Sequence, residues 1–273
     1  MFSRIAKEKG FCIGLVLMIF LIIIALFANF LAPYAPKQLT DDLLVAPGNQ
    51  GHYFGTDSLG GDVFSNIIYG TRTSLTIGLV ASLISAVIGV AVGAVAGYFG
   101  GEWDRVISEF INIFVMTPAF FLILIIVAFF GSSMTNVMIV IGFTSWVGNA
   151  RIMRAQAMSI KERTFVKSAY ILGEKHRNIL LSHIIPNAIY PIIANTIMNI
   201  SGAILLEASL SFLGLGDPNV VSWGQMISQG SAYMPRSWWV STFPGIAIVI
   251  TVLSLQLIGD GINKILTPKT PKG

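Results

Sequence analysis

The chain has few charged residues and a single cysteine. Asp, Glu, Lys and Arg together make up 11% of its 273 residues, whereas hydrophobic residues make up 54%, and the mean hydropathy is +0.76. These values lie outside the range of soluble domains and indicate an integral membrane protein. The lone thiol, Cys12, allows no internal disulfide bond and no cysteine-based metal site.

Signatures of catalysis are also absent. The sequence contains no G-x-x-x-x-G-K-[ST] phosphate loop, no H-E-x-x-H and no G-x-S-x-G, and its three histidines lie in different segments. We therefore expect no enzyme activity, no bound cofactor and no metal, so any energy from ATP must come from another chain. Charged residues are also lacking at mid-span, which disfavours a carrier driven by an ion relay.

Six stretches are apolar enough to cross a bilayer core of about 30 Å, which needs about 20 helical residues. The fourth is the shortest and most polar, so we expect it to face protein rather than lipid. The stretches lie near residues 11–31, 74–99, 106–130, 134–150, 187–209 and 240–260. The sequence thus predicts an all-α membrane protein with about six transmembrane helices, the first an uncleaved anchor.

The basic residues are distributed unevenly between the segments that join these stretches. If the N-terminus is cytoplasmic, all of the 17 Lys and Arg except Lys37, Arg72 and Arg236 lie in cytoplasmic segments. The positive-inside rule explains this bias, so both termini are predicted to be cytoplasmic. The net charge of +4 then reflects membrane orientation, and nucleic-acid binding is not expected.

One long hydrophilic interval separates the fourth stretch from the fifth. It runs from Arg151 to Pro186 and contains seven Lys or Arg against two Glu. Its apolar residues recur at helical spacing until Gly173 interrupts them. We predict two short amphipathic helices around a glycine joint, held at the cytoplasmic surface and presenting a face to a partner.

Ala169, Gly173 and Pro186 have a spacing within this interval that matches a known family pattern. It resembles the EAA loop of the inner-membrane permeases of binding-protein-dependent ABC importers, in the dipeptide, oligopeptide and nickel branch. That pattern is E-A-A, three residues, Gly, nine residues, then I-x-L-P. Lysine stands at the acidic first position here, and His183 stands at the isoleucine position.

Further motifs extend the resemblance over nearly the whole chain. FGTDSLGGDVFSNIIYGTRTSL, from Phe54 to Leu75, is similar to a signature of the second permease of peptide systems. EASLSFLGLG, from Glu207 to Gly216, matches another element of that subfamily. Gly61 and Asn66 stand where the family usually has arginine, so the outer salt bridges of the family do not carry over directly.

The resemblance implies the type I permease architecture of ABC importers, in a bacterial or archaeal plasma membrane. It also implies a second homologous permease, two ATPase subunits that use ATP and Mg, and an extracytoplasmic solute-binding protein. The implied solute is a dipeptide or oligopeptide, with nickel or a metal chelate as the alternative. A self-sufficient channel or secondary carrier, or an interaction subunit without conduction, is less favoured.

The resemblance further assigns the interval 151–186 to ATPase coupling. Four apolar side chains of its first helix would enter a cleft on an ATPase subunit, Gly173 would permit a turn, and Pro186 would open the next span. The coupling residues are Phe165, Val166, Lys167, Ser168, Ala169, Leu172, Gly173 and Pro186. The alternative is that this helix only lies on lipid headgroups.

The domain organisation follows from these assignments. We expect a cytoplasmic N-terminus and first anchor in residues 1–31, and an extracytoplasmic strap with a surface helix near Val63 in residues 32–73. The permease domain would then occupy residues 74–263, followed by a cytoplasmic tail in residues 264–273.

Three sets of residues allow a structural and a functional interpretation. Gly89, Gly93 and Gly97 recur every four residues and favour close helix packing over a role in the solute path. Pro118 and Pro191 are expected to kink their helices.

Glu207, near the outer end of the fifth stretch, is the third case. Its carboxylate could contact a cationic peptide terminus or a metal on the substrate path. A structural hydrogen bond beside the following SLSFLG turn is favoured over that role.

Overall fold

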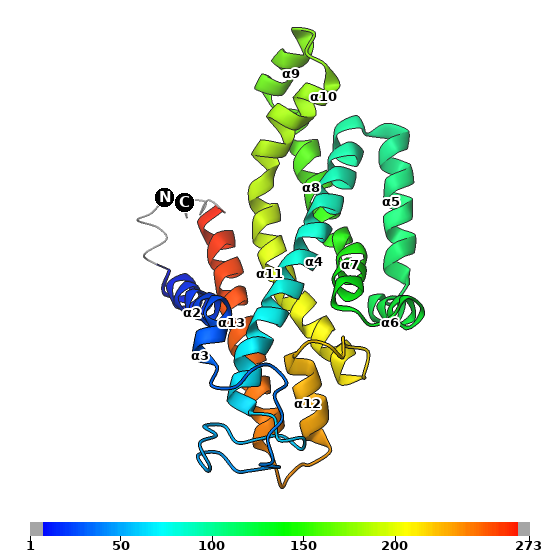
Figure 1. Ribbon diagram of the computed structural model, residues 1–273. Coiled ribbons are helices and arrows are strands. Elements are labelled where there is room, and N and C mark those ends of the chain that lie inside the picture. Colours follow the sequence, from blue (N-terminus) through cyan, green and yellow to red (C-terminus); the bar gives the residue numbers. More distant parts are fainter. Residues whose placement is uncertain (1–7, 267–273) are drawn as a thin grey trace.

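The computed structural model describes residues 8–266, and these residues form an elongated bundle of helices (Figure 1). Within that range there is no β-strand, only isolated bridges between Asn49 and His52 and between Thr56 and Asp62. The predicted all-α class is therefore confirmed.

The central element is helix α4, Val63–Phe99. Its 37 residues extend over about 55 Å at 1.5 Å per residue, well beyond a bilayer core. The helix begins where the Asp62 side chain accepts a hydrogen bond from the Ser65 N–H, at 2.8 Å, and ends at Gly100, which has a φ of +67°. The surface helix expected near Val63 is thus the start of α4, and the boundary expected at residue 73 falls inside this helix.

The third apolar stretch is sharply bent. Helices α5, Gly101–Met116, and α6, Ala119–Phe130, meet at an angle of 80°. Pro118 lies at the break, and Thr117 before it is extended, with a φ of −84° and a ψ of +123°. A residue before proline disfavours the helical region, so the expected kink at Pro118 is confirmed as a break.

The fourth apolar stretch is not one helix. It is divided at Ser145 into α7, Met134–Thr144, and α8, Trp146–Lys161, and α8 continues well beyond the expected end at residue 150. Within residues 8–266, four helices are long and apolar enough to span a membrane, or five if the bent pair α5 and α6 counts as one span. The sequence predicted about six spans; α7 and α8, which together cover the fourth stretch, have 11 and 16 residues, and each is shorter than the about 20 residues that one helix needs to cross alone.

The interval after α8 folds into the tip of the molecule. It contains α9, Thr164–Ile171, then α10, His176–Asn178, and a π-helical turn, η1, Ile179–Ile184. The turn runs directly into α11, Ile185–Phe212, so Pro186 is the second residue of a helix that continues a preceding one. Helix α11 also continues through Pro191.

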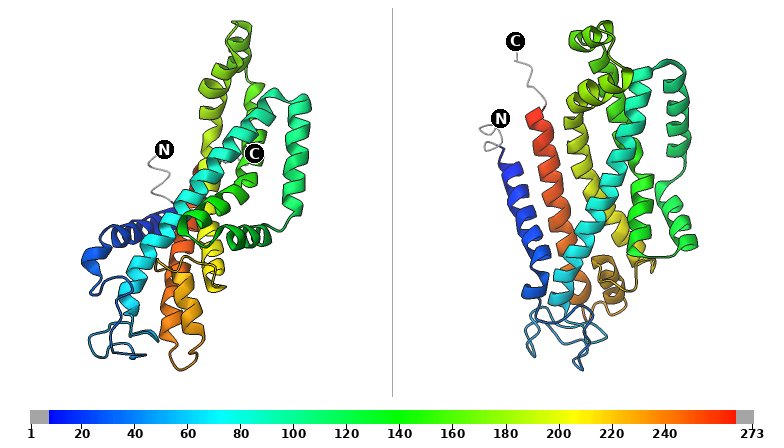
Figure 2. Two further views of the ribbon diagram at one scale, coloured as in Figure 1. Left: turned by 45° about the vertical axis from the view of Figure 1, so that its right-hand side comes forward. Right: turned by 45° about the horizontal axis from the view of Figure 1, so that its top comes forward.

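Four further helices complete the described part of the bundle. They are α2, Lys9–Leu26, α3, Ala28–Leu31, α12, Trp223–Ser231, and α13, Trp239–Leu266. Helices α2 and α13 lie side by side, as the right-hand view in Figure 2 shows. Glu8 and Lys264 form an ion pair of 3.6 Å, so the two ends of the described chain lie at the same end of the bundle. Which side of the membrane this end faces remains a prediction.

Small residues set the distance between α4 and α8. A Cβ atom on Gly93 would come within 2.3 Å of the Ala150 carbonyl oxygen, and one on Gly97 within 2.4 Å of the Arg154 carbonyl oxygen. Gly89 approaches α8 just as closely, at Asn149. Backbones that approach this closely gain packing contacts that larger side chains would prevent, which confirms the packing interpretation of this glycine stripe.

Candidate functional site

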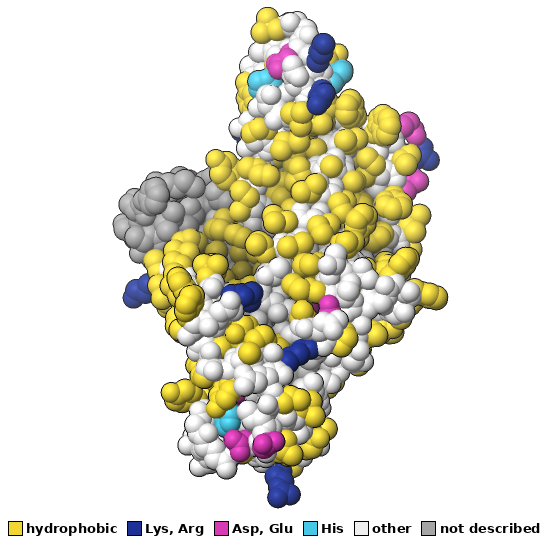
Figure 3. Space-filling view, in the orientation of Figure 1, with side chains coloured by type: hydrophobic (Ala, Val, Ile, Leu, Met, Phe, Trp, Pro, Cys, Tyr) yellow, Lys and Arg dark blue, Asp and Glu magenta, His cyan; other side chains and the backbone are white. Residues whose placement is uncertain are grey.

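Helix α9 protrudes at one end of the molecule, beyond the apolar middle. Hydrophobic side chains cover the central part of the face seen in Figure 3, whereas the tip formed by α9 and α10 carries Lys or Arg and His side chains. The tip ends in a close turn at Gly173, which has a φ of +80°. The Gly173 N–H bonds the Tyr170 carbonyl at 3.0 Å, and the Glu174 N–H bonds the Ala169 carbonyl at 3.1 Å. This pair of bonds is the Schellman arrangement, and it explains the glycine that the sequence singled out.

The two faces of α9 have different neighbours. Val166 and Ala169 are only 3% and 8% exposed, because they join a core cluster with residues of α4, α8, η1 and α11. Phe165 is 41% exposed, and Leu172 is 85% exposed. The expectation that all four side chains enter a partner's cleft is therefore wrong for Val166 and Ala169, which the chain's own core already covers.

The exposed side of α9 includes residues that the motif did not single out. Ile171 is 82% exposed and Tyr170 is 61% exposed, and Lys167 and Ser168 are exposed as well. Together with Phe165 and Leu172, these residues form what we call the tip face. The helical spacing picked out Phe165, Ala169 and Leu172, of which only Ala169 is buried, and it carried no signal for Ile171, which lies off that stripe.

Polar contacts hold the tip to the rest of the chain. Glu174 accepts from His183 Nε2 at 3.0 Å, and the Tyr98 hydroxyl lies 2.7 Å from His176 Nδ1. Lys167 lies 2.8 Å from Glu162, and its hydrogen bond holds the pKa of that carboxyl below its usual value. The tip is thus fastened at its base, while the tip face stays open.

Glu207 lies inside the bundle. It is 3% exposed, and its Oε1 accepts a hydrogen bond from the Ser211 hydroxyl at 2.6 Å, one helical turn further along α11. The favoured structural hydrogen bond is present. A contact of Glu207 with the solute stays a prediction.

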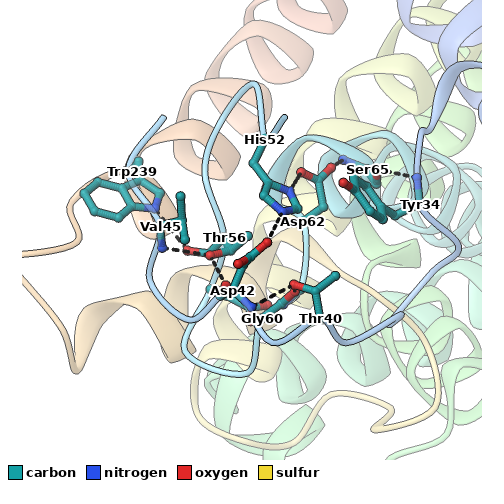
Figure 4. A network of polar contacts seen from close by, with 12 residues as sticks. Tyr34, Thr40, Asp42, Val45, His52, Thr56, Gly60, Asp62, Ser65 and Trp239 are labelled. Atoms are coloured by element: carbon teal, nitrogen blue, oxygen red, sulfur yellow. Dashed lines mark hydrogen bonds and ion pairs between the residues drawn. The ribbon is translucent and has the colours of Figure 1, made fainter. Parts of the chain in front are cut away.

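The strap, residues 32–62, is folded onto the N-terminal ends of α4 and α13. Buried His52 contacts Asp62 through Nδ1 at 2.8 Å and Asp42 through Nε2 at 3.5 Å, as Figure 4 shows. Trp239 at the start of α13 donates to the Thr56 carbonyl at 3.1 Å. Trp239 and Thr56 lie 183 positions apart, so the sequence signature indicates this segment but not its pairing with α13.

A cavity of about 330 Å³ with a mixed polar and apolar lining opens between the strap and α12. Gly61 and Asn66, where the sequence departs from the family signature, both line it. Lys37 and Asp57 supply its charged groups, and Ser222 and Gln225 extend the polar lining on the α12 side.

Comparison with known families settles what kind of protein has these features. Residues 89–272 match the family described as "Binding-protein-dependent transport system inner membrane component". The chain belongs to this family. Residues 1–50 also match the "N-terminal TM domain of oligopeptide transport permease C". The protein is therefore a permease of an ABC importer and a multi-pass protein of the inner membrane.

Two curated permeases illustrate the relationship. The chain is 38% identical over 270 residues to the dipeptide transport system permease protein DppC of Escherichia coli, covering 96% of this chain and 90% of that protein. It is 39% identical over 254 residues to the glutathione transport system permease protein GsiD of Shigella sonnei, covering 92% and 84% respectively.

Solved structures agree on the fold. The inward-facing MetNI methionine ABC transporter has a chain that matches 74% of this permease, with a TM-score of 0.60 at 19% identity. A chain in the crystal structure of an amino acid ABC transporter with histidines matches with a TM-score of 0.55 at 18% identity. The predicted permease architecture is thereby confirmed.

Proposed function

We propose that this permease forms half of a translocation pathway for dipeptides and short oligopeptides. The relatives support this solute class, because one is named for dipeptides and the other for glutathione, which is itself a tripeptide. Both align with nearly the whole of this chain, so the similarity is not limited to one part of the permease fold.

We further propose that the loop 151–186 couples this pathway to ATP hydrolysis in partner subunits. The observation that carries this proposal is the tip face, where Ile171 and Leu172 are more than four-fifths exposed at the end of a helix whose opposite face is buried. Large apolar side chains exposed on a charged tip favour a protein partner. In this proposal Val166 and Ala169 hold the helix, and the tip face contacts the ATPase.

Movement would pass from α9 into the spans through packed side chains. Val166 lies in one core cluster with Met153 of α8, Ile179 of η1 and Ile192 of α11. Helix α11 continues from η1 without a break, so a displacement of the tip would be transmitted along a rigid element. Gly173 ends α9 and separates it from that continuous helix.

The proposed complex has four further members. They are a second homologous permease, two ABC ATPases that bind ATP and Mg, and a solute-binding protein at the outer face. The membrane would be the plasma membrane of a bacterium or archaeon.

The solute class is tested by uptake in a strain that lacks this chain, before and after its return. We expect radiolabelled Ala-Ala uptake to depend on the chain and on ATP, while nickel uptake does not change. Restoration of nickel uptake alone would keep the ABC mechanism and replace the solute. Ala-Ala uptake that does not depend on the chain would overturn the peptide assignment.

A further inference from the structure

The cavity between the strap and α12 contains two opposite charges. Lys37 and Asp57 both line it, together with the amide and hydroxyl side chains of Asn66, Gln225 and Ser222. Its volume of about 330 Å³ lies at the lower end of the range for small-molecule sites. Leu39, Leu59 and Met226 add apolar surface, so a cavity of this size fits one small molecule with charged ends and an apolar part better than an extended chain.

In the described part of the chain, only one oxygen of the Asp57 carboxylate has hydrogen-bond partners. Its Oδ1 accepts the N–H groups of Leu59 and Gly61, each at 2.8 Å. Its Oδ2 has no hydrogen-bond or ion-pair partner within residues 8–266. Partial burial raises the pKa of this carboxyl against the opposing effect of the Gly61 and Leu59 N–H groups. A cation beside Oδ2 would offset that cost of burial.

Gly61 keeps this oxygen accessible. A Cβ atom at this position would lie 2.5 Å from Asp57 Oδ2 and 3.1 Å from Asn66 Nδ2. Its φ is not in the left-handed region, so a strained backbone does not explain the glycine. The absence of a side chain at residue 61 instead leaves open the space in front of the unpaired carboxylate oxygen.

The positive group comes from the strap in an unusual conformation. Lys37 has a φ of +57°, which costs a residue other than glycine about 1 kcal/mol. Its N–H lies 3.5 Å from Asn66 Oδ1, and its ammonium group donates to the Pro218 carbonyl. Lys37 therefore lies between the strap and the loop before α12, and two of its three ammonium N–H groups are left for other acceptors.

We propose that this cavity is a subsite for a short zwitterionic peptide, with the α-ammonium group at Asp57 and the α-carboxylate at Lys37. A dipeptide spans at most about 7 Å, which suits a small cavity. The side-chain amides of Asn66 and Gln225 supply donors and acceptors for the peptide group. This inference rests on the proposed function, since it places the imported solute class on this chain.

A docking protein could also reach Asp57 with a single lysine or arginine. Such a side chain would use the carboxylate alone and would leave Lys37 and the amides without a role. The presence of both charges in one cavity therefore favours a molecule that carries both, and the free peptide is the occupant that we assign.

The test uses the full chain in nanodiscs and a photoreactive dipeptide, Ala-photoleucine, with mapping of the labelled peptides by mass spectrometry. We expect labelling in residues 37–66 and 221–229 that Ala-Ala prevents and N-acetyl-Ala-Ala does not. Asp57→Asn should weaken competition by Ala-Ala about tenfold or more, because a charge-assisted contact is lost. Gly61→Ala, which covers Oδ2, should have a similar effect.

Matched variants separate charge from structure. Lys37→Asn removes the ammonium group but keeps a residue type that tolerates left-handed backbone. It should therefore weaken competition by Ala-Ala but not competition by Ala-Ala amide. Asp41→Asn removes an equal charge from an exposed part of the strap and should change competition by neither compound. Labelling elsewhere, or labelling in this region that is equal in all variants, would overturn the subsite.

Uptake measurements distinguish this failure from failure of the proposed function. If the intact complex imports Ala-Ala and Asp57→Asn leaves both labelling and uptake unchanged, the subsite is wrong and the peptide function stands. If the intact complex does not import Ala-Ala, the peptide function itself is wrong. If Asp57→Asn weakens only binding of the solute-binding protein, the cavity is a docking contact and the subsite is overturned.

Discussion

Arg154 of α8 and Asp104 of α5 lie 50 positions apart in the sequence, and two hydrogen bonds join them, one of which measures 2.7 Å. The guanidinium donates through Nε and Nη2 to the two carboxylate oxygens, which is the strong bidentate form of an ion pair. This pair fastens the start of α5 to the part of α8 that leads to the tip.

Loss of this pair should destabilise the fold. We expect Arg154→Ala to lower the free energy of unfolding by about 1–2 kcal/mol, because the Asp104 side chain is only 19% exposed and loses its partner. Thermal unfolding in detergent, with Asp104→Ala and the double variant, gives the coupling between the two residues. Arg105→Ala breaks only exposed pairs and should change stability by less than about 0.5 kcal/mol. Additive effects of the two single changes would mean that the pair contributes nothing.

The glycine stripe makes a second prediction. Gly93→Ala should cost about 1–3 kcal/mol, because its Cβ would meet the backbone of α8 and force the helices apart. The matched control is Gly202→Ala in α11, where nothing lies within 4 Å of the added Cβ. That change should be neutral or should stabilise the protein by up to about 1 kcal/mol. Equal stabilities for the two variants would contradict the close approach of α4 and α8.

Asp217 should make the stability of the fold depend on pH, with stability lost as the pH falls. Burial raises the pKa of its carboxyl. Hydrogen bonds from the Asn219 and Met134 N–H groups, at 2.8 and 2.9 Å, lower this pKa by more than burial raises it, so the folded-state pKa lies below its ordinary value. The stabilisation is therefore present at neutral pH and is lost as the pH falls below about 4, when the carboxylate is protonated. Asp217→Asn should be less stable than wild type at pH 7, and the difference should shrink as the pH falls.

Unfolding temperatures of the two proteins between pH 7 and pH 3 test this expectation. Asp41→Asn, which removes an exposed carboxylate, serves as the control. A difference between wild type and Asp217→Asn that stays constant over this range would show that the carboxylate charge does not strengthen the hydrogen bonds from Met134 and Asn219.

The sequence predicted the parts of the fold that depend on local chemistry. Apolar length located α4 and α11, and proline predicted a kink at Pro118. The repeat of glycines predicted that another helix packs closely on α4, and the structure shows that this helix is α8. Gly173 was correctly placed at a turn, since its left-handed backbone is a local requirement.

What the sequence could not predict depends on contacts between distant segments. Neither proline nor glycine stands at Ser145, where α7 ends, so no local signal predicted this break. Helix α8 then continues from Trp146 to Lys161, at the base of the tip. Helical spacing identified an apolar stripe containing Ala169, and the family resemblance added Val166, but neither could tell whether these side chains face the chain's own core or a partner. The answer depends on Tyr98 and Ile179, which lie in other helices.

The central claim is that the tip face couples this permease to its ATPases, and copurification with peptide-stimulated ATP hydrolysis tests it most directly. We predict that Leu172→Asp inserts normally, loses most of the bound ATPase and abolishes stimulation, because a charge replaces an exposed apolar contact. Thr164→Asp adds the same charge at the favourable N-terminus of α9 and should behave as wild type. ATPase association and stimulation that are unchanged in Leu172→Asp would contradict the account.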